Sequence, residues 1–151
     1  MKNRTLVTAL PFHLGQEVTI AGWLHNLRDM KNFGFAILRD RTGLAQVVLE
    51  AAHLEQLKGL QLETVIKVIG VVKEKKSKDP NAKEVEVQCV TLEILSPVTD
   101  PVPVEIAKPD IDVQLETLLD NRVVTLRHPK QRAIFRVQAA LVHGYRAYME
   151  R

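Results

Sequence analysis

Residues 18–49, VTIAGWLHNLRDMKNFGFAILRDRTGLAQVVL, contain three segments in which apolar and polar side chains alternate. The segments are 18–26, 33–39 and 44–49, and such a period of two is typical of strands with one buried face. Between the second and third segments, the sequence RDRTG at 39–43 contains an aspartate and a glycine, which suit a tight hairpin turn. This stretch therefore predicts three strands, of which the last two form a hairpin.

The chain that follows completes the pattern of a small barrel. Leucines recur every three residues in 51–62, which predicts a short helix despite Gly59. Alternation returns at 64–73 and 84–95, on either side of a charged loop at 74–83. The resulting order is that of the OB-fold, a mainly β, five-stranded Greek-key barrel with a helix between strands 3 and 4. Another small β-barrel or a sandwich with an added helix fits the same order.

Beyond residue 95 the composition changes. Four of the seven prolines lie in 96–110, at Pro97, Pro101, Pro103 and Pro109. Because proline fixes φ and lacks an N–H group, this stretch is expected to be an extended hinge. A short helix is predicted at 115–121. A longer one from Pro129 carries a single apolar stripe, made of Ile134, Val137, Leu141, Tyr145 and Tyr148.

We therefore expect three parts. Residues 1–95 form the barrel, 96–110 form the Pro-rich hinge, and C-terminal helices in 111–151 begin a further domain that the chain does not complete.

Charge and cysteine content narrow the class of protein. The formal net charge is +3 and the isoelectric point about 9.1, which is compatible with a polyanionic partner without requiring one. No apolar run approaches the roughly 20 residues that a bilayer span needs, and the first residues lack a secretory signal. A single cysteine, Cys89, cannot build a disulfide framework. A soluble protein of the cytoplasm is expected.

The sequence lacks the constellations that make or break bonds. Its five histidines have no metal-ligand spacing, no glycine-rich phosphate loop follows a strand, and no serine sits in a nucleophile elbow. We therefore expect no catalytic residue, metal or cofactor in this chain, and binding is the favoured class of function.

The binding candidates lie on the predicted strands. If Ala36 and Leu38 point into the barrel, Phe35 points outward and offers an unpaired base a surface to stack on. The alternative is that Phe35 belongs to the core, since Ile37 shares its face. Polar side chains that can bond base edges and phosphates surround it in the sequence pattern, namely Asn26, Arg28, Gln46 and Glu86.

These residues also carry a family resemblance. GWLHNLRD at 22–29, Phe35, and LRDRTGLAQVV at 38–48 resemble the N-terminal domain of aspartyl-tRNA synthetases, to which asparaginyl- and lysyl-tRNA synthetases are related. LSP at 95–97 with PVPVEI at 101–106 is similar to the hinge of these enzymes. LLDNRVVTLR at 118–127 resembles the entry to their catalytic domain, and the helix from Pro129 resembles the first half of class II motif 1.

The resemblance implies roles for particular residues. Phe35 would stack on the central anticodon base, Arg28 and Gln46 would contact anticodon bases or backbone, and Glu86 would read another anticodon position. Asn26 would belong to the same site. A loop approaching from the other side would carry Lys78, Pro80 and Lys83. A histidine at His25 and a proline at Pro80 resemble relaxed enzymes that charge both tRNA-Asp and tRNA-Asn, although each also fits an ordinary strand or turn position.

The resemblance further implies a longer parent enzyme. That parent would be a homodimer that uses ATP and Mg²⁺ to join aspartate to tRNA, whereas motifs 2 and 3 lie beyond residue 151 and this chain alone is expected to be inactive. Two alternatives stay open: a piece of an asparaginyl-tRNA synthetase, and a freestanding OB-fold module that binds single-stranded nucleic acid.

Overall fold

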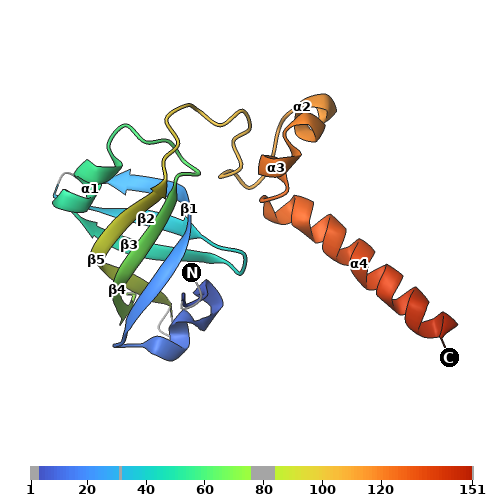
Figure 1. Ribbon diagram of the computed structural model, residues 1–151, viewed down its shortest axis with the longest axis horizontal. Coiled ribbons are helices and arrows are strands. Elements are labelled where there is room, and N and C mark those ends of the chain that lie inside the picture. The colour runs from blue at the N-terminus through green and yellow to red at the C-terminus, as the bar shows by residue number, and fades with distance from the viewer. Residues whose placement is uncertain (1–3, 31, 76–83, 151) are drawn as a thin grey trace. The chain divides into compact units, whose positions relative to one another are not determined.

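The computed structural model describes residues 4–30, 32–75 and 84–150 (Figure 1). The chain separates into two compact units, Met1–Val102 and Pro103–Arg151. The first unit contains the β-structure and the second contains the C-terminal helices. The finer division into 1–95, 96–110 and 111–151 stays a prediction.

Five strands close into a barrel in the first unit. They are β1 (Glu17–Asp29), β2 (Phe33–Arg39), β3 (Leu44–Glu50), β4 (Val65–Glu74) and β5 (Val85–Ser96). Their order around the barrel is β1-β2-β3-β5-β4, with β3 and β5 parallel. Helix α1 (Ala51–Leu57) lies between β3 and β4 in the sequence. This arrangement confirms the predicted OB-fold.

The long first strand closes the barrel by pairing with two neighbours. Its first half pairs with β4 and its second half with β2, and Trp23 has a partner on each side. Gly22 lies at this junction, where an added Cβ atom would sit 2.1 Å from the carbonyl oxygen of Arg39. Strands β1 and β2 can therefore approach this closely because residue 22 has no side chain.

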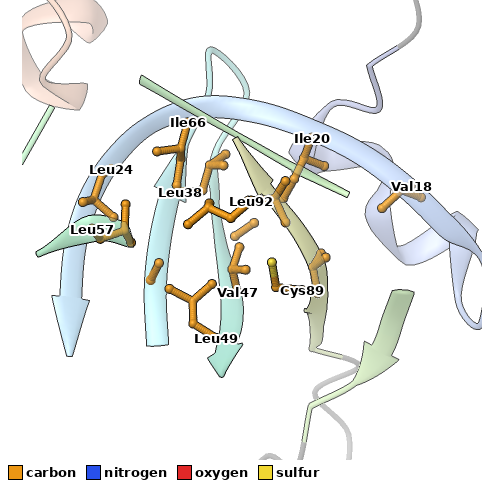
Figure 2. Packing of buried hydrophobic residues seen from close by; sticks show 14 of the residues in the cluster. Val18, Ile20, Leu24, Leu38, Val47, Leu49, Leu57, Ile66, Cys89 and Leu92 are labelled. Atoms are coloured by element: carbon orange, nitrogen blue, oxygen red, sulfur yellow. The ribbon is translucent and has the colours of Figure 1, made fainter. Parts of the chain in front are cut away.

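The barrel interior is filled by the inward-pointing residues of all five strands (Figure 2). Ala36 and Leu38 are fully buried, as the outward assignment of Phe35 requires. Cys89 is buried among these side chains. Burial, with a smaller contribution from the charge of Glu50, raises the pKa of the Cys89 thiol to about 11. The thiol is thus a small apolar core residue.

The β2–β3 hairpin turn is organised by one carboxylate. Asp40 accepts hydrogen bonds from the backbone N–H groups of Thr42, Gly43 and Val7 and from the Thr42 hydroxyl, at 2.6–3.0 Å. Burial alone would raise the pKa of Asp40, but these hydrogen bonds outweigh it and hold the pKa below its usual value. The charged carboxylate thus joins the turn to the N-terminal segment.

Three elements differ from the sequence-based expectation, one of them the short helix α3 (Arg122–Thr125), which was not predicted. The predicted helix 51–62 ends at Leu57, because Lys58 is extended and Gly59 adopts a left-handed φ of +79°. The leucines beyond it, Leu60 and Leu62, still pack against the core. A 3₁₀ helix, η1 (Val7–His13), was not predicted. It buries Leu10 in the barrel cluster.

The second unit contains three helices, α2 (Leu115–Asp120), α3 (Arg122–Thr125) and α4 (Pro129–Met149). His128 caps α4 by accepting the Lys130 N–H, while its other ring nitrogen lies 3.0 Å from the Lys108 carbonyl oxygen. The predicted stripe on α4 is solvent-exposed. Among the described residues, no helix has the length and apolar character that crossing a membrane requires.

Candidate nucleic-acid interface

Two rows of side chains cross the outer face of the barrel. Strand pairing places one residue of each of β1, β2, β3 and β5 side by side in each row. The aromatic row is Arg28, Phe35, Val48 and Gln88, and the polar row is Asn26, Ile37, Gln46 and Glu86. Neighbours within a row lie on strands about 4.8 Å apart, and the two rows are about 7 Å apart along the strands.

An irregularity in β1 makes these rows possible. Inward-pointing residues of β1 are even-numbered up to Leu24, so a regular strand would turn Asn26 and Arg28 inward as well. The pairing with β2 instead shifts between Leu24 and Asn26, which leaves His25 as the extra residue. Beyond this bulge Leu27 packs on the core, and Asn26 and Arg28 are exposed.

Phe35 lies on the outer face and is half-buried. Its ring meets the ring of Phe33 edge to face, with centroids 5.5 Å apart and planes at 88°. Phe33 is 43% exposed. An aromatic ring held in this way at the surface offers a flat face to an unpaired base. The outward assignment of Phe35 is confirmed, and Ile37 lies on the same outer face. The role of Phe35 in binding stays a prediction.

The polar row contains a hydrogen-bonded pair. The side-chain amide of Gln46 donates to a carboxylate oxygen of Glu86 at 2.9 Å, across the parallel β3–β5 pair. Asn26 accepts the N–H of Leu27 through its side-chain oxygen at 2.8 Å. The row thus presents amide and carboxylate groups, which bond the edges of exposed bases.

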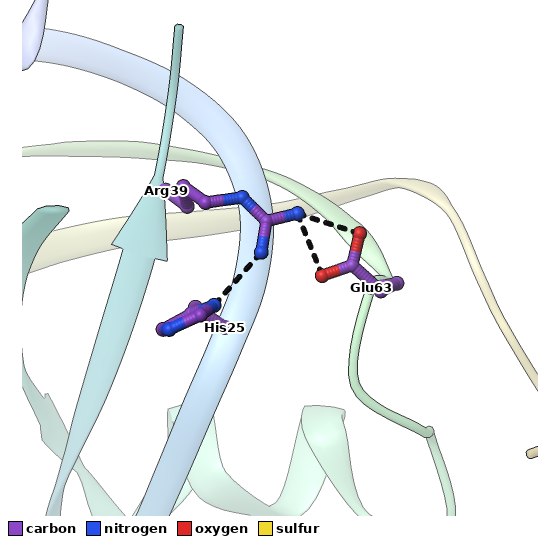
Figure 3. A network of polar contacts seen from close by, with 3 residues as sticks. All are labelled: His25, Arg39 and Glu63. Atoms are coloured by element: carbon purple, nitrogen blue, oxygen red, sulfur yellow. Dashed lines mark hydrogen bonds and ion pairs between the residues drawn. The ribbon is translucent and has the colours of Figure 1, made fainter. Parts of the chain in front are cut away.

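His25 takes part in a different set of contacts (Figure 3). Its Nδ1 atom lies 2.8 Å from a terminal nitrogen of Arg39. The other terminal nitrogen of Arg39 donates to both carboxylate oxygens of Glu63 at 2.7 Å, and both partners are about 95% buried. The Arg39 guanidinium also lies 5.6 Å from the centre of the Trp23 ring. Neither Arg39 nor Glu63 was identified from the sequence as a site residue. The alternation of β2 places Arg39 on the outer face and gives no sign that its side chain is buried there by a partner.

Three predicted residues, Lys78, Pro80 and Lys83, lie outside the described residues. At the base of their loop, Lys75 forms an ion pair with Glu84 at 2.7 Å, and Lys73 pairs in register with Glu86. Within the part of the chain that the structure describes, no group of three or more His, Cys, Asp or Glu side chains could hold a metal ion.

Comparison with known proteins agrees with this geometry. The OB-fold nucleic acid binding domain family of the tRNA anti-codon type matches residues 18–95. The chain is 44% identical over 151 residues to an aspartate–tRNA(Asp/Asn) ligase of Thermus thermophilus, covering 98% of this chain and 33% of that one. It is 40% identical over 147 residues to the Deinococcus radiodurans ligase of the same name, covering 97% and 32%.

A solved structure is similar over the same extent. The asparaginyl-tRNA synthetase of Pyrococcus horikoshii superposes with a TM-score of 0.80 at 29% identity, covering 99% of this chain and 36% of that one. The chain therefore spans about a third of the length of the relatives that it matches.

Proposed function

This chain belongs to the family of OB-fold nucleic acid binding domains, and we propose that it is the anticodon-reading domain of an aspartyl-tRNA synthetase that accepts both tRNA-Asp and tRNA-Asn. The observation that carries the proposal is the pair of rows on the outer face, where an outward aromatic ring lies beside amide, guanidinium and carboxylate groups. The names of the relatives, aspartate–tRNA(Asp/Asn) ligases, support the relaxed specificity.

Each row supports one part of anticodon recognition. In the aromatic row, the central base stacks on Phe35, a contact worth roughly 1–3 kcal/mol, while the exposed Arg28 beside it neutralises a phosphate. In the polar row, Glu86 accepts from the adjacent N1–H and N2–H groups of a guanine, the base that begins both anticodons. Gln46, hydrogen-bonded to Glu86, fixes the direction of that carboxylate and contacts the neighbouring base.

Asn26 and His25 supply the remaining contacts of the described site. Asn26 stands at the end of the polar row on β1. The resemblance assigns His25 to the reading of the third anticodon base, and it assigns Lys78, Pro80 and Lys83, which lie outside the described residues, to the specificity loop of the same site. Lysines there attract RNA of any sequence, since phosphate contacts carry no sequence information.

The proposal extends to the longer enzyme. Residues 1–95 read the anticodon, 96–110 connect, and 111–151 begin a catalytic domain that works in the cytoplasm as a homodimer. That domain uses ATP and Mg²⁺ to join aspartate to tRNA. This chain by itself is proposed to bind tRNA without charging it.

An asparaginyl-tRNA synthetase is the second candidate, favoured by the solved structure at 29% identity. The anticodon of tRNA-Asn shares two of its three bases with the anticodon of tRNA-Asp, so RNA binding alone does not separate the two enzymes. Charging assays on the full-length enzyme with aspartate and asparagine do, because the amino-acid pocket lies outside this chain.

Binding of three anticodon stem-loops at fixed salt tests the proposal. The loops carry GUC, GUU and an unrelated anticodon with the same stem. We expect similar affinities for GUC and GUU. The affinity for the unrelated loop should be at least tenfold lower, because a loss of about tenfold is what one mismatched contact costs. Equal affinity for all three would favour the freestanding, non-specific OB-fold module instead, and preference for GUC alone would support a strict enzyme.

A further inference from the structure

Phe33 is an aromatic side chain of the outer face that the proposed anticodon contacts leave unused. It is the first residue of β2 and lies two residues before Phe35, so both side chains are on the same face, about 7 Å apart along the strand. Phe33 is 43% exposed and lies outside the buried cluster. Packing of the barrel core therefore does not account for an aromatic residue at this position.

The backbone that carries Phe33 is held firmly, although its ring is exposed. The N–H group of Met30 donates to the Phe33 carbonyl oxygen at 2.9 Å, which closes the turn between β1 and β2. At the next residue, a Cβ atom added to Gly34 would lie 2.6 Å from the carbonyl oxygen of Arg28 and 2.7 Å from a methyl carbon of Leu54. The start of β2 is thus packed closely against β1 and α1, and it presents the Phe33 ring at a fixed place.

The ring of Phe33 is set at a right angle to the ring of Phe35. Their centroids are 5.5 Å apart and their planes meet at 88°, so the edge of one ring covers one face of the other. Each ring has two faces, and the exposure of Phe33 leaves much of its surface open to solvent. Bases lying flat on the two rings would be perpendicular to each other and therefore not stacked together. Single-stranded RNA is commonly recognised with its bases unstacked and splayed out in this way.

We propose that Phe33 is a second stacking surface, which binds an unpaired base of the anticodon loop outside the triplet. This inference rests on the proposed function, in which the bases of the triplet are assigned to Phe35, Glu86 and His25. The base on Phe33 therefore comes from a loop nucleotide that adjoins the triplet. Met30, in the same turn, is 55% exposed and adds apolar surface. Stacking accepts every base because each has a π face, so this contact holds the loop without reading its sequence.

Removing the ring tests whether it contributes to binding. Phe33→Ala should stay folded, as thermal unfolding checks, and should bind a GUC stem-loop at least about fivefold more weakly at fixed salt, the lower limit for one stacked base. Phe33→Leu keeps an apolar side chain beside Phe35 but has no π face, and should lose most of the same affinity. Phe12→Ala is the matched control, because Phe12 lies on η1 and is 84% exposed, and it should bind fully. Full affinity in both Phe33 variants overturns the inference.

Removing bases from the RNA separates stacking on Phe33 from mere support of the Phe35 ring. In GUC stem-loops, the central uridine and each loop nucleotide outside the triplet are replaced, one at a time, by an abasic nucleotide. At one flanking position we expect a cost of at least about fivefold in the unaltered chain and of less than about twofold in Phe33→Ala, because ring and base form one contact. The abasic central position should cost both chains a similar factor. Coupling of Phe33 to the central base alone, or to no nucleotide, overturns the inference.

The outcomes separate this inference from the proposed function. Exchanging the base at the coupled position should change the affinity much less than removing it, and a strong dependence on its identity overturns a contact that does not read sequence. Preference for GUC over the unrelated stem-loop, with no loss in Phe33→Ala, overturns the inference alone. Equal binding of GUC and the unrelated stem-loop overturns the proposed function, whatever the Phe33 variants do.

Discussion

Replacing Phe35 by alanine tests whether its ring is a stacking surface. The ring lies on the outer face, outside the buried cluster, so its loss leaves the barrel core intact. Its described aromatic contact is the edge-to-face pair with Phe33, and losing such a pair lowers the free energy of unfolding by about 1 kcal/mol. Losing the stacked base costs roughly 1–3 kcal/mol of binding. The variant should therefore stay folded and bind a GUC stem-loop roughly 5- to 150-fold more weakly.

The assay is fluorescence anisotropy with labelled GUC and GUU stem-loops at one fixed salt concentration, because phosphate contacts make affinity depend strongly on salt. Phe35→Leu keeps an apolar side chain without a π face, and should lose most of the same affinity. Phe12→Ala is the matched control, since Phe12 lies on η1 and is 84% exposed. Full affinity in a folded Phe35→Ala variant, or an equal loss in Phe12→Ala, would refute the stacking role.

Four further predictions follow from single contacts. Asp40→Asn should lower the free energy of unfolding by about 1–3 kcal/mol, the value of hydrogen bonds to a charged group. Because the pKa of Asp40 is lowered in the folded chain, its stabilising contribution is present above the unfolded pKa of about 3.9 and is lost as the pH falls through the folded pKa. The stability of the variant should therefore depend less on acid in urea titrations, and equal dependence would contradict the assignment. Gly22→Ala should destabilise by about 1–3 kcal/mol in the same titrations, since its Cβ would meet the Arg39 carbonyl; unchanged stability would show that the two strands separate easily. Cys89, with its pKa raised to about 11, should react with iodoacetamide at pH 8 far more slowly in the native chain than in urea; equal rates would place the thiol at the surface. Glu86→Gln should weaken binding to stem-loops whose anticodon begins with guanine and leave an adenine-initiated loop unaffected; a uniform loss would reduce Glu86 to a general contact.

The sequence predicted the barrel because its strands follow one simple rule. Alternation in 33–39 and 44–49 identified the strands but left two orientations of Phe35 open; the family resemblance favoured the outward one, and the burial of Ala36 and Leu38 agrees with it. The aspartate and glycine of the 39–43 turn identified the hairpin. By contrast, η1 was missed because its buried Leu10 stands alone, without a periodic pattern around it. The helix from residue 51 was predicted to be too long because the leucine spacing continues past Gly59. The chain leaves the helix before that glycine, and the later leucines pack against the core from a loop.

The site was only partly predictable because it depends on pairing between distant strands. Gln46 and Glu86 are 40 residues apart in the chain, and their hydrogen bond requires the parallel β3–β5 register. Nothing in the local sequence around Glu63 indicates that it pairs with Arg39, 24 residues earlier. The roles of Phe35, Arg28 and Glu86 came from a family resemblance, whereas their side-by-side placement comes from the register.

The bulge at His25 connects the fold to the proposed function. A strand of period two that pairs with β4 in its first half would carry the same parity into its second half, and Asn26 and Arg28 would then face the core. One extra residue reverses that parity and brings both side chains to the rows. The extra residue cannot follow the regular alternation itself, and it is the histidine whose ring Arg39 contacts. The irregularity that aligns the polar side chains on β1 with Phe35 and Gln46 therefore also leaves His25 as the residue whose ring lies 2.8 Å from Arg39. The ion pair of Arg39 with Glu63 is buried, although the alternation of β2 would have left Arg39 in solvent.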